Sequence, residues 1–163
     1  MDAIKSIALV AHDNRKRDLL EWLRFNYGTL AAHNIICTGT TGRMVERLMQ
    51  DLAAQNDTDD SGRVIVKLKS GPLGGDQQLG AMIAEGKIDL VIFFWDPMEP
   101  HPHDVDVKAL LRIAVVYNIP IACNRSSADF MVSSSLMSRQ YQPQAHDYSD
   151  YLGRRVNGAH DAE

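Results

Sequence analysis

Five short runs of apolar residues recur along this chain, and each is followed by a polar loop and then by a helix-like pattern. The runs lie at residues 4–11, 35–38, 64–68, 90–95 and 119–123. Within them the apolar residues are continuous rather than alternating with polar ones, which is typical of parallel strands buried on both faces. Five such repeats predict a Rossmann-like three-layer αβα sandwich with a mostly parallel five-stranded sheet.

The length of 163 residues predicts a single domain that spans residues 1–163. Two segments depart from the repeating pattern. Residues 53–63 are polar and acidic, and we expect them to form a surface insertion. Residues 134–163 form a poorly patterned tail, in which only residues 148–156 indicate one more short helix.

Charge and cysteine content limit the classes of partner and compartment. The net charge of −4, without a basic block, argues against nucleic acid as a partner. No apolar run approaches the length that spans a membrane, so a membrane partner is not expected either. The amino terminus has no cleavable signal pattern, and Cys37 and Cys123 are too few for a disulfide framework. We therefore expect a cytoplasmic protein.

The polar loops indicate where the chemistry lies. In an open parallel sheet, ligands bind beyond the carboxyl ends of the strands. The loops expected at that edge are all rich in Gly, Pro, Thr, Asp or His, whereas those at the opposite edge are unexceptional. They are residues 12–16, 38–42, 70–78, 96–106 and 124–127. This asymmetry predicts one composite site at one edge of the sheet.

The loop at residues 70–78, here called the glycine loop, reads Ser-Gly-Pro-Leu-Gly-Gly-Asp-Gln-Gln. Its glycine N–H groups and the start of the helix that follows suit an anion. Asp76 within this loop has the residue type preferred at a helix N-cap, and a carboxylate beside an anion is also a candidate general base. Both roles are open from the sequence, and the position of the loop at the predicted site favours Asp76 filling both.

Residues 38–42, here called the threonine loop, read Thr-Gly-Thr-Thr-Gly. Their hydroxyl and N–H groups at a helix start suit a phosphate. An ordinary helix cap is an alternative explanation for the same Thr and Gly residues. No Walker A motif occurs, and no G-x-G-x-x-G follows the first strand, so nucleoside triphosphate hydrolysis and classical dinucleotide binding are disfavoured. Lys16 or Arg15 is a candidate for the positive charge beside the phosphate.

His101-Pro102-His103-Asp104-Val105-Asp106 contains several side chains that bind metals, so a metal hydrolase is one interpretation. No second cluster of comparable density occurs, and Asp104 is placed to cap the helix that follows. We therefore expect no metal and no cofactor. A histidine here suits a neutral electrophile or proton donor near a substrate oxygen.

Several of these motifs, taken together, resemble the methylglyoxal synthase family. They follow one another from residue 7 to about residue 129, with an interruption near residues 50–63. The motifs are Ile7-Ala8-Leu9-Val10-Ala11-His12-Asp13, the threonine loop, the glycine loop, Phe94-Trp95-Asp96-Pro97, and Pro102-His103-Asp104-Val105-Asp106-Val107-Lys108-Ala109-Leu110-Leu111-Arg112.

The resemblance implies a metal-free lyase that converts dihydroxyacetone phosphate to methylglyoxal and inorganic phosphate through an enediolate, usually as a homohexamer. Asp76 resembles the general base, His103 the residue placed at the carbonyl and hydroxyl oxygens, and Asp106 a supporting carboxylate. The implied substrate and phosphate contacts are His12, Lys16, Thr38, Gly39, Thr40, Thr41, Ser70, Gly71 and Arg155. Asp13 and Asp96 match motif aspartates whose roles are open.

Inorganic phosphate is expected to inhibit the reaction, because it presents the same tetrahedral oxygens as the substrate ester. The fold also resembles a regulatory module of carbamoyl phosphate synthetase, which binds small phosphorylated effectors without catalysis. The presence of both Asp76 and His103 favours the enzyme over that alternative.

Overall fold

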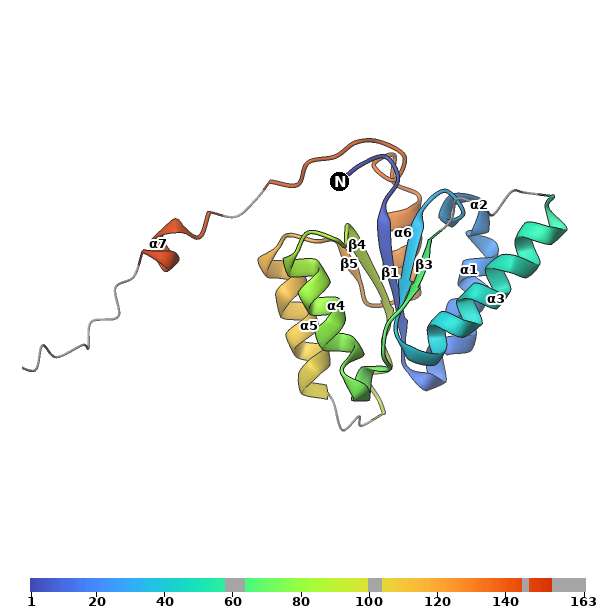
Figure 1. The fold of residues 1–163 in the computed structure, drawn as a ribbon, viewed down its shortest axis with the longest axis horizontal. Coiled ribbons are helices and arrows are strands. Elements are labelled where there is room, and N and C mark those ends of the chain that lie inside the picture. The colour runs from blue at the N-terminus through green and yellow to red at the C-terminus, as the bar shows by residue number, and fades with distance from the viewer. Residues whose placement is uncertain (58–63, 100–103, 145–146, 154–163) are drawn as a thin grey trace, which may run out of the picture.

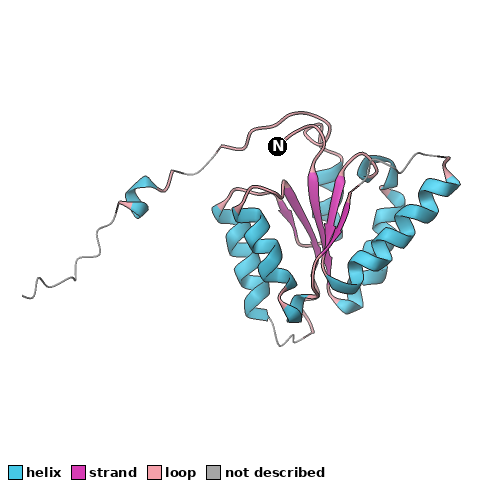
Figure 2. Cartoon of the chain, viewed as in Figure 1, coloured by secondary structure: helices cyan, strands magenta, loops and turns pink. Residues whose placement is uncertain are grey.

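The computed structural model describes residues 1–57, 64–99, 104–144 and 147–153. Its centre is a five-stranded sheet in the order β3-β2-β1-β4-β5, and every strand pair is parallel. The strands are β1 (Ser6–Ala11), β2 (Asn34–Cys37), β3 (Ile65–Lys67), β4 (Leu90–Phe94) and β5 (Ile121–Ala122). The predicted five-stranded parallel sheet is therefore confirmed (Figure 2).

Helices cover both faces of this sheet, which gives the three layers expected (Figure 1). Residues of α1, α3 and α6 share one core cluster with the sheet, and residues of α4 and α5 share the other. The helices are α1 (Lys16–Phe25), α2 (Tyr27–Leu30), α3 (Gly39–Gln55), α4 (Gly75–Ala84), α5 (Asp104–Val116), α6 (Arg125–Val132) and α7 (Ser149–Leu152). Two short 3-10 turns, η1 (Asp13–Arg15) and η2 (Gly71–Leu73), precede α1 and α4.

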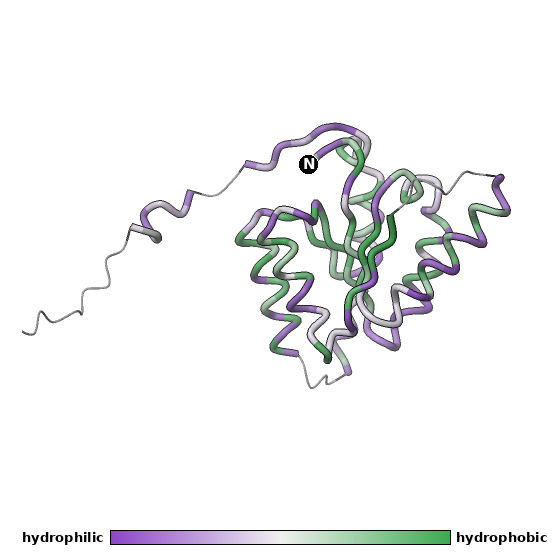
Figure 3. The backbone as a smooth tube through the Cα atoms, viewed as in Figure 1, coloured by the Kyte–Doolittle hydropathy of each residue, from purple (hydrophilic) through white to green (hydrophobic). Residues whose placement is uncertain are grey.

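The strands supply buried side chains to both layers, which explains their continuous apolar sequence. On β1, Ile7 and Leu9 face the cluster that contains α1 and α3, whereas Ala8 and Val10 face the cluster that contains α4 and α5. The apolar colour in Figure 3 is accordingly concentrated on the strands and on the helix sides that meet them. Burial on both faces thus holds the carboxyl ends of the strands in fixed positions.

The strand order creates a switch point at β1. This strand pairs with β2 on one side and with β4 on the other, with Leu9 opposite both Cys37 and Ile92. The chain moves outward from β1 to β3, then crosses back to β4 and β5 on the other side. In such sheets the loops diverge where the direction reverses and leave room for a ligand. The switch point therefore lies beside the loops after β1 and β4.

The start of the tail packs against the opposite edge of the sheet. Met137 is buried, the N–H of Tyr141 donates to the carbonyl of Met1 over 3.1 Å, and Nζ of Lys5 donates to the carbonyl of Arg139 over 2.6 Å. Farther along, the expected short helix is present as α7, which Figure 1 shows apart from the sandwich. The tail is therefore partly integrated into the domain.

One predicted boundary is wrong. Helix α3 continues to Gln55, so residues 53–55 are helical rather than part of a surface loop. The physical reason is that Leu52 and Ala53 remain on the buried side of the helix. Residues 58–63 of the expected insertion lie outside the described residues. Among the helices that the structure does describe, none has the length and apolar character needed to cross a membrane.

Candidate active site at the carboxyl edge of the sheet

A cavity of about 450 Å³, here called the first cavity, lies at the carboxyl edge of the sheet. Its walls come from β1 and the loop after it, the threonine loop, the glycine loop and Phe93 of β4. Most of the predicted site residues line it: His12, Lys16, Thr38, Gly39, Thr40, Thr41, Ser70, Gly71 and Asp76. The structure thus brings together residues from three of the five loops. His103 and Arg155 lie outside the described residues.

The threonine loop forms the start of α3 at the cavity wall. Thr38 is the N-cap residue, as the alternative of an ordinary helix cap predicts, but its side chain makes no capping hydrogen bond. Thr38 and Thr41 are both buried. The first turn of a helix carries a partial positive charge from its N–H groups, and here that end borders the cavity. The loop is therefore suited to an anion such as phosphate.

Lys16 brings a full positive charge to the same wall. It is the first residue of α1, and its Nζ hydrogen-bonds to Oδ1 of Asp13 and Oγ1 of Thr40. These contacts hold the ammonium between the loop after β1 and the first turn of α3. Asp13, whose role the sequence left open, is thus a partner of this lysine.

The glycine loop is folded tightly by its own backbone. The carbonyl of Ser70 accepts hydrogen bonds from the N–H groups of Leu73 and Gly75, over 3.0 and 2.9 Å. Gly74 has φ of +95°, in the left-handed region where glycine is favoured. A Cβ on Gly75 would lie 2.1 Å from the carbonyl oxygen of Lys69. The order Gly-Gly at these two positions is therefore required by the turn.

This turn determines the role of Asp76. The N-cap of α4 is Gly74, and Asp76 is the second residue inside the helix, so the prediction that it caps the helix is wrong. Because Gly74 takes the left-handed conformation, the helix begins earlier than the Asp signal indicates. The Asp76 side chain is buried, with the residue 6% exposed, and it lines the first cavity. Asp76 therefore faces the cavity at the positive end of α4.

Asp76 also borders a second cavity, of about 400 Å³, between α4 and α5. Asp106 lines this second cavity and is absent from the described lining of the first. The structure therefore places Asp106 on the α5 side of Asp76, away from the threonine loop. The sequence put both carboxylates at one site but gave no indication that they share the second cavity while only Asp76 also lines the first.

His12 is oriented by the loop after β4. Its Nδ1 accepts a hydrogen bond from the backbone N–H of Asp96 over 3.1 Å, and its ring packs edge-on against Phe93 with centroids 5.0 Å apart. The residue is buried and lines the first cavity. Phe93 was missed in the sequence as a site residue. The alternation of strand faces is the signal that could have placed it there, because Val10 on the neighbouring strand points the same way.

Asp96 ties the loops after β1 and β4 together. Its Oδ1 accepts from the N–H of Met98 over 3.1 Å and lies 3.8 Å from Nη2 of Arg15. The Met98 hydrogen bond, followed by the Arg15 charge, lowers the pKa of the Asp96 carboxyl below its ordinary value. The side chain is thus a stable anion that supports the loop, and this gives Asp96 a positioning role that its motif left open.

The metal interpretation finds no support in the described part of the chain. No group of three His, Cys, Asp or Glu side chains there is placed to hold a metal ion. Asp104 is the first residue of α5, inside the helix rather than before it, and its Oδ2 pairs with Nζ of Lys108 over 2.8 Å. His101 and His103 lie outside the described residues, so the structure does not test the metal cluster as a whole.

Comparison with known proteins agrees with this geometry. A family model described as an MGS-like domain matches residues 18–123. A methylglyoxal synthase of Maridesulfovibrio salexigens is 53% identical over 96% of this chain and 100% of its own length. One from Cellvibrio japonicus is 54% identical over 97% of this chain and 95% of its own.

A solved structure leads to the same family. The crystal structure of methylglyoxal synthase from Elizabethkingia anophelis superposes with a TM-score of 0.83 at 49% identity, and the match covers 98% of this chain and 97% of that one. The family match, the full-length relatives and the shared fold all agree. The chain therefore belongs to the methylglyoxal synthase family.

Proposed function

We propose that this protein converts dihydroxyacetone phosphate to methylglyoxal and inorganic phosphate. The observation that carries the proposal is that Asp76 and the threonine loop line one and the same cavity. A candidate base and an anion site in one cavity are what a reaction needs when a proton is removed near a phosphate ester. The family membership and the names of the full-length relatives support the same reaction.

The phosphate of the substrate binds, in this proposal, at the first turn of α3 and the start of the glycine loop. Thr38, Thr41 and Ser70 offer hydroxyl groups, and Lys16 adds a positive charge held at Thr40. Charge-assisted hydrogen bonds of this kind favour a phosphate dianion. Arg155, which lies outside the described residues, is proposed as a further phosphate contact on the resemblance alone.

Asp76 is the proposed general base. Its carboxylate removes a proton from the hydroxymethyl carbon, and the electron pair of that C–H bond forms the C–C double bond of the enediolate. A proton acceptor must lie at the substrate cavity, and the proposal is supported by Asp76 lining the first cavity from the first turn of α4. Asp106 is proposed to support this carboxylate from the second cavity, which both residues line.

The developing oxyanion of the enediolate needs fixed hydrogen-bond donors. His12 is a proposed donor, because Nδ1 accepts from the Asp96 N–H and the neutral ring then carries its proton on Nε2. His103 is proposed to act at the carbonyl and hydroxyl oxygens on the resemblance alone. Together these two histidines would place donors at the oxygens where negative charge develops.

The position of the phosphate decides the outcome for the enediolate. When the C–O bond to phosphate is held out of the enediolate plane, the electrons of the intermediate form a new C–C double bond and break that C–O bond. Inorganic phosphate leaves with the electron pair of that bond, and the enol that remains gains a proton on its methylene carbon and loses its hydroxyl proton, which gives methylglyoxal. The fixed first turn of α3 is therefore proposed to control which product forms as well as how tightly the substrate binds.

The direct experiment mixes purified protein with dihydroxyacetone phosphate and follows phosphate and dicarbonyl release together. We expect equal amounts of both products. Phosphate without dicarbonyl would indicate a phosphatase, and neither product would favour the regulatory module, which the full-length relatives do not favour. Inorganic phosphate added to the assay is expected to raise the apparent KM, because it competes for the threonine loop.

We also propose a homo-oligomer, with the hexamer implied by the family resemblance. Support comes from large apolar side chains on the surface, since Phe25 and Phe130 are 85% and 83% exposed and border one hollow between α1 and α6. Exposed aromatic residues that cluster in this way are typical of a protein interface. Light scattering tests the proposal, and a monomer at the assay concentration would contradict it.

A further inference from the structure

The side chain of Gln78 reaches back from α4 to the segment that follows β3. Its Oε1 accepts a hydrogen bond from the backbone N–H of Lys69 over 2.8 Å. The N–H of Gln78 itself already donates to the carbonyl of Gly74, so its side chain is free to make a contact outside the helix. Gln78 lines neither the first nor the second cavity. Its contact with Lys69 is therefore not a contact with a bound substrate.

The peptide group that Gln78 binds also meets the start of α3. This group, between Leu68 and Lys69, donates its N–H to Gln78. Its carbonyl oxygen accepts from the N–H of Gly39 over 3.2 Å, and the same N–H is shared with the carbonyl of Lys69 over 3.0 Å. A peptide group is planar and rigid, and hydrogen bonds in a chain polarise one another. One peptide thus joins the first residue of α3 to the first turn of α4.

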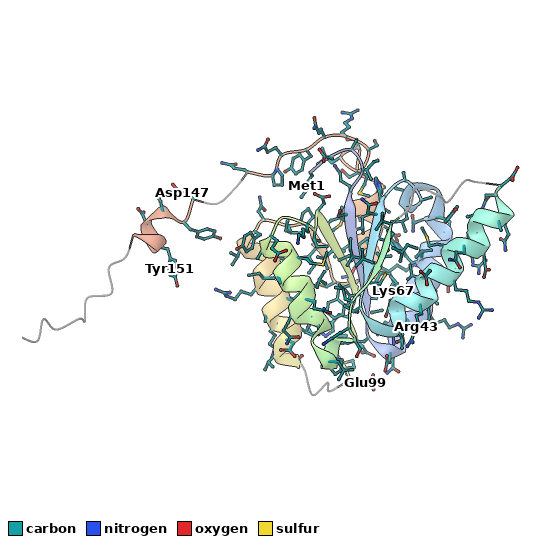
Figure 4. All side chains as sticks on the ribbon, viewed as in Figure 1. Met1, Arg43, Lys67, Glu99, Asp147 and Tyr151 are labelled. Carbon is teal, nitrogen blue, oxygen red and sulfur yellow. The ribbon has the colours of Figure 1, made fainter. Side chains whose placement is uncertain are left out.

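The two helix starts are packed closely against this junction. A Cβ on Gly39 would lie 2.7 Å from Cα of Ser70, and one on Gly75 would lie 2.1 Å from the carbonyl oxygen of Lys69. In the view of Figure 4, β3 runs between α3 and α4, with the labelled Lys67 at the end of the strand. Both helices therefore begin in direct backbone contact with the segment after β3.

These two helix starts carry the two halves of the proposed reaction. Thr38 and Thr41 line the first cavity at the start of α3, and Asp76 lines it from the first turn of α4. Gln78 lies two residues beyond Asp76 in the same helix. A hydrogen bond from Gln78 to the peptide that contacts α3 therefore restricts how far the base can move from the anion site.

We propose that Gln78 is a positioning residue that determines the fate of the enediolate, and this inference rests on the proposed function. Through the peptide between Leu68 and Lys69, Gln78 keeps Asp76 at a fixed position relative to the phosphate site at the start of α3. The substrate is then held by its phosphate and by its reacting carbon in one geometry. That geometry keeps the C–O bond to phosphate out of the enediolate plane.

A looser junction allows the enediolate to return instead of eliminating phosphate. With the C–O bond in the enediolate plane, that bond stays intact and the intermediate takes up a proton on carbon. A proton on the hydroxymethyl carbon restores dihydroxyacetone phosphate. A proton on the former carbonyl carbon, with transfer of the hydroxyl proton to the neighbouring oxygen, gives glyceraldehyde 3-phosphate. The ratio of returned to eliminated intermediate therefore reports the geometry at the junction.

The test measures this ratio in deuterated water for wild type, Gln78→Leu and Gln78→Glu. Mass spectrometry counts deuterium in the remaining three-carbon phosphates, and a phosphate assay counts elimination. The ratio is expected to rise about 2- to 10-fold in Gln78→Leu, the factor that corresponds to one lost hydrogen bond. Gln78→Glu keeps an oxygen that accepts from the Lys69 N–H, so it is expected to restore the wild-type ratio.

Gln77→Leu is the matched control. Gln77 is the neighbouring glutamine of α4, is also exposed, and lies outside the lining of the first cavity. This variant is expected to give the wild-type ratio. A variant that is partly unfolded loses return and elimination equally, so a loss of fold lowers the total rate but does not change the ratio.

Three results overturn the positioning role while wild-type dicarbonyl release leaves the proposed function intact. They are an unchanged ratio in Gln78→Leu, an equal rise in Gln77→Leu, and a failure of Gln78→Glu to restore the ratio. A wild type that releases no dicarbonyl overturns the proposed function itself, and the positioning role with it.

Discussion

The backbone N–H of Asp96 donates a hydrogen bond to Nδ1 of His12 over 3.1 Å, and this bond determines which ring nitrogen carries the proton. A backbone N–H only donates, so Nδ1 must be the acceptor, and the neutral ring is protonated on Nε2. The loop after β4 thus sets the hydrogen-bonding character of a residue in the loop after β1. Both loops meet at the switch point of the sheet.

Replacing His12 by Asn tests the donor role of Nε2 separately from the acceptor role of Nδ1. The Asn Oδ1 reproduces the acceptor for the Asp96 N–H but provides no donor at the position of Nε2. We expect kcat to fall by about 10²- to 10³-fold, the usual cost of losing one oxyanion donor, with little change in Tm. Steady-state dicarbonyl release and thermal melting measure the two effects. A kcat close to wild type would mean that His12 only forms part of the cavity wall.

Two glycines of α4 allow the tight turn before this helix to be tested by matched substitutions to alanine. Gly75→Ala places a methyl group 2.1 Å from the carbonyl oxygen of Lys69, whereas at Gly80 the nearest atom to a Cβ is Cγ2 of Ile113 at 3.8 Å. We expect Gly75→Ala to cost about 1–3 kcal/mol or more in unfolding free energy. Gly80→Ala should instead stabilise by up to about 1 kcal/mol, because alanine favours the helix. Urea unfolding measures both, and an equal effect at the two positions would contradict the turn geometry.

The layered fold and the location of the site were predictable from the sequence because one physical cause controls both. Continuous apolar runs require a sheet buried on both faces, and helices on both faces require parallel crossovers, which collect the polar loops at one edge. The helix start at α6 follows the same local logic, because Asn is a preferred N-cap residue and Oδ1 of Asn124 accepts from the N–H of Ser127 over 2.9 Å. Each of these features depends on local pattern alone.

The features that were missed depend on backbone geometry and on contacts between distant residues. Asp76 was expected to cap α4, but the left-handed conformation of Gly74 moves the helix start ahead of it. The position of Asp106 beyond Asp76 follows from the packing of α4 on α5, which no single motif encodes. The loops at the opposite edge seemed unexceptional, yet His33 there is buried and accepts a hydrogen bond from the N–H of Lys5.

His33 gives the fold a specific pH dependence. Burial, and then the nearby Lys5 charge, lower its pKa below 6.5, while Asp89 opposes the shift. A histidine with a lowered folded pKa binds its proton more weakly in the folded chain than in the unfolded chain. Its contribution to stability is therefore fully present above pH 6.5 and is lost as pH falls from 6.5 toward the folded pKa. We expect stability to decrease over this range by at most about 1.4 kcal/mol per pH unit for this one proton.

The variant His33→Asn isolates that effect. Asn Oδ1 still accepts the hydrogen bond from Lys5 but does not titrate. The free energy of unfolding, measured by urea at several pH values on both sides of 6.5, should show a shallower decline for the variant than for wild type. Parallel curves for the two proteins would assign the acid sensitivity to other groups.

Chelation tests the metal-free mechanism. We expect kcat and KM to be unchanged after exhaustive treatment with a chelator, because the proposed acid–base steps use Asp76 and the histidines alone. A loss of activity that one added divalent metal restores would instead favour a metal site. That site would include His101, His103, Asp104 and Asp106. Dicarbonyl release before and after treatment is the measurement.

The proposed reaction depends most directly on Asp76 acting as the general base. Since Gly74 rather than Asp76 is the N-cap, Asp76→Asn removes only the favourable charge near the start of α4, about 0.3–1 kcal/mol, so Tm should change little. An amide does not accept a proton at neutral pH, so kcat should fall by about 10²- to 10⁴-fold. Gln77→Ala, in the same helical turn but outside the lining of the first cavity, is the control and should keep near wild-type kcat.

The deciding measurement is steady-state dicarbonyl release by Asp76→Asn, with its Tm recorded on the same preparation. A nearly unchanged Tm with kcat reduced at least about a hundredfold is the result that a general base at Asp76 predicts. A variant that melts like wild type and releases dicarbonyl at close to the wild-type rate would contradict it.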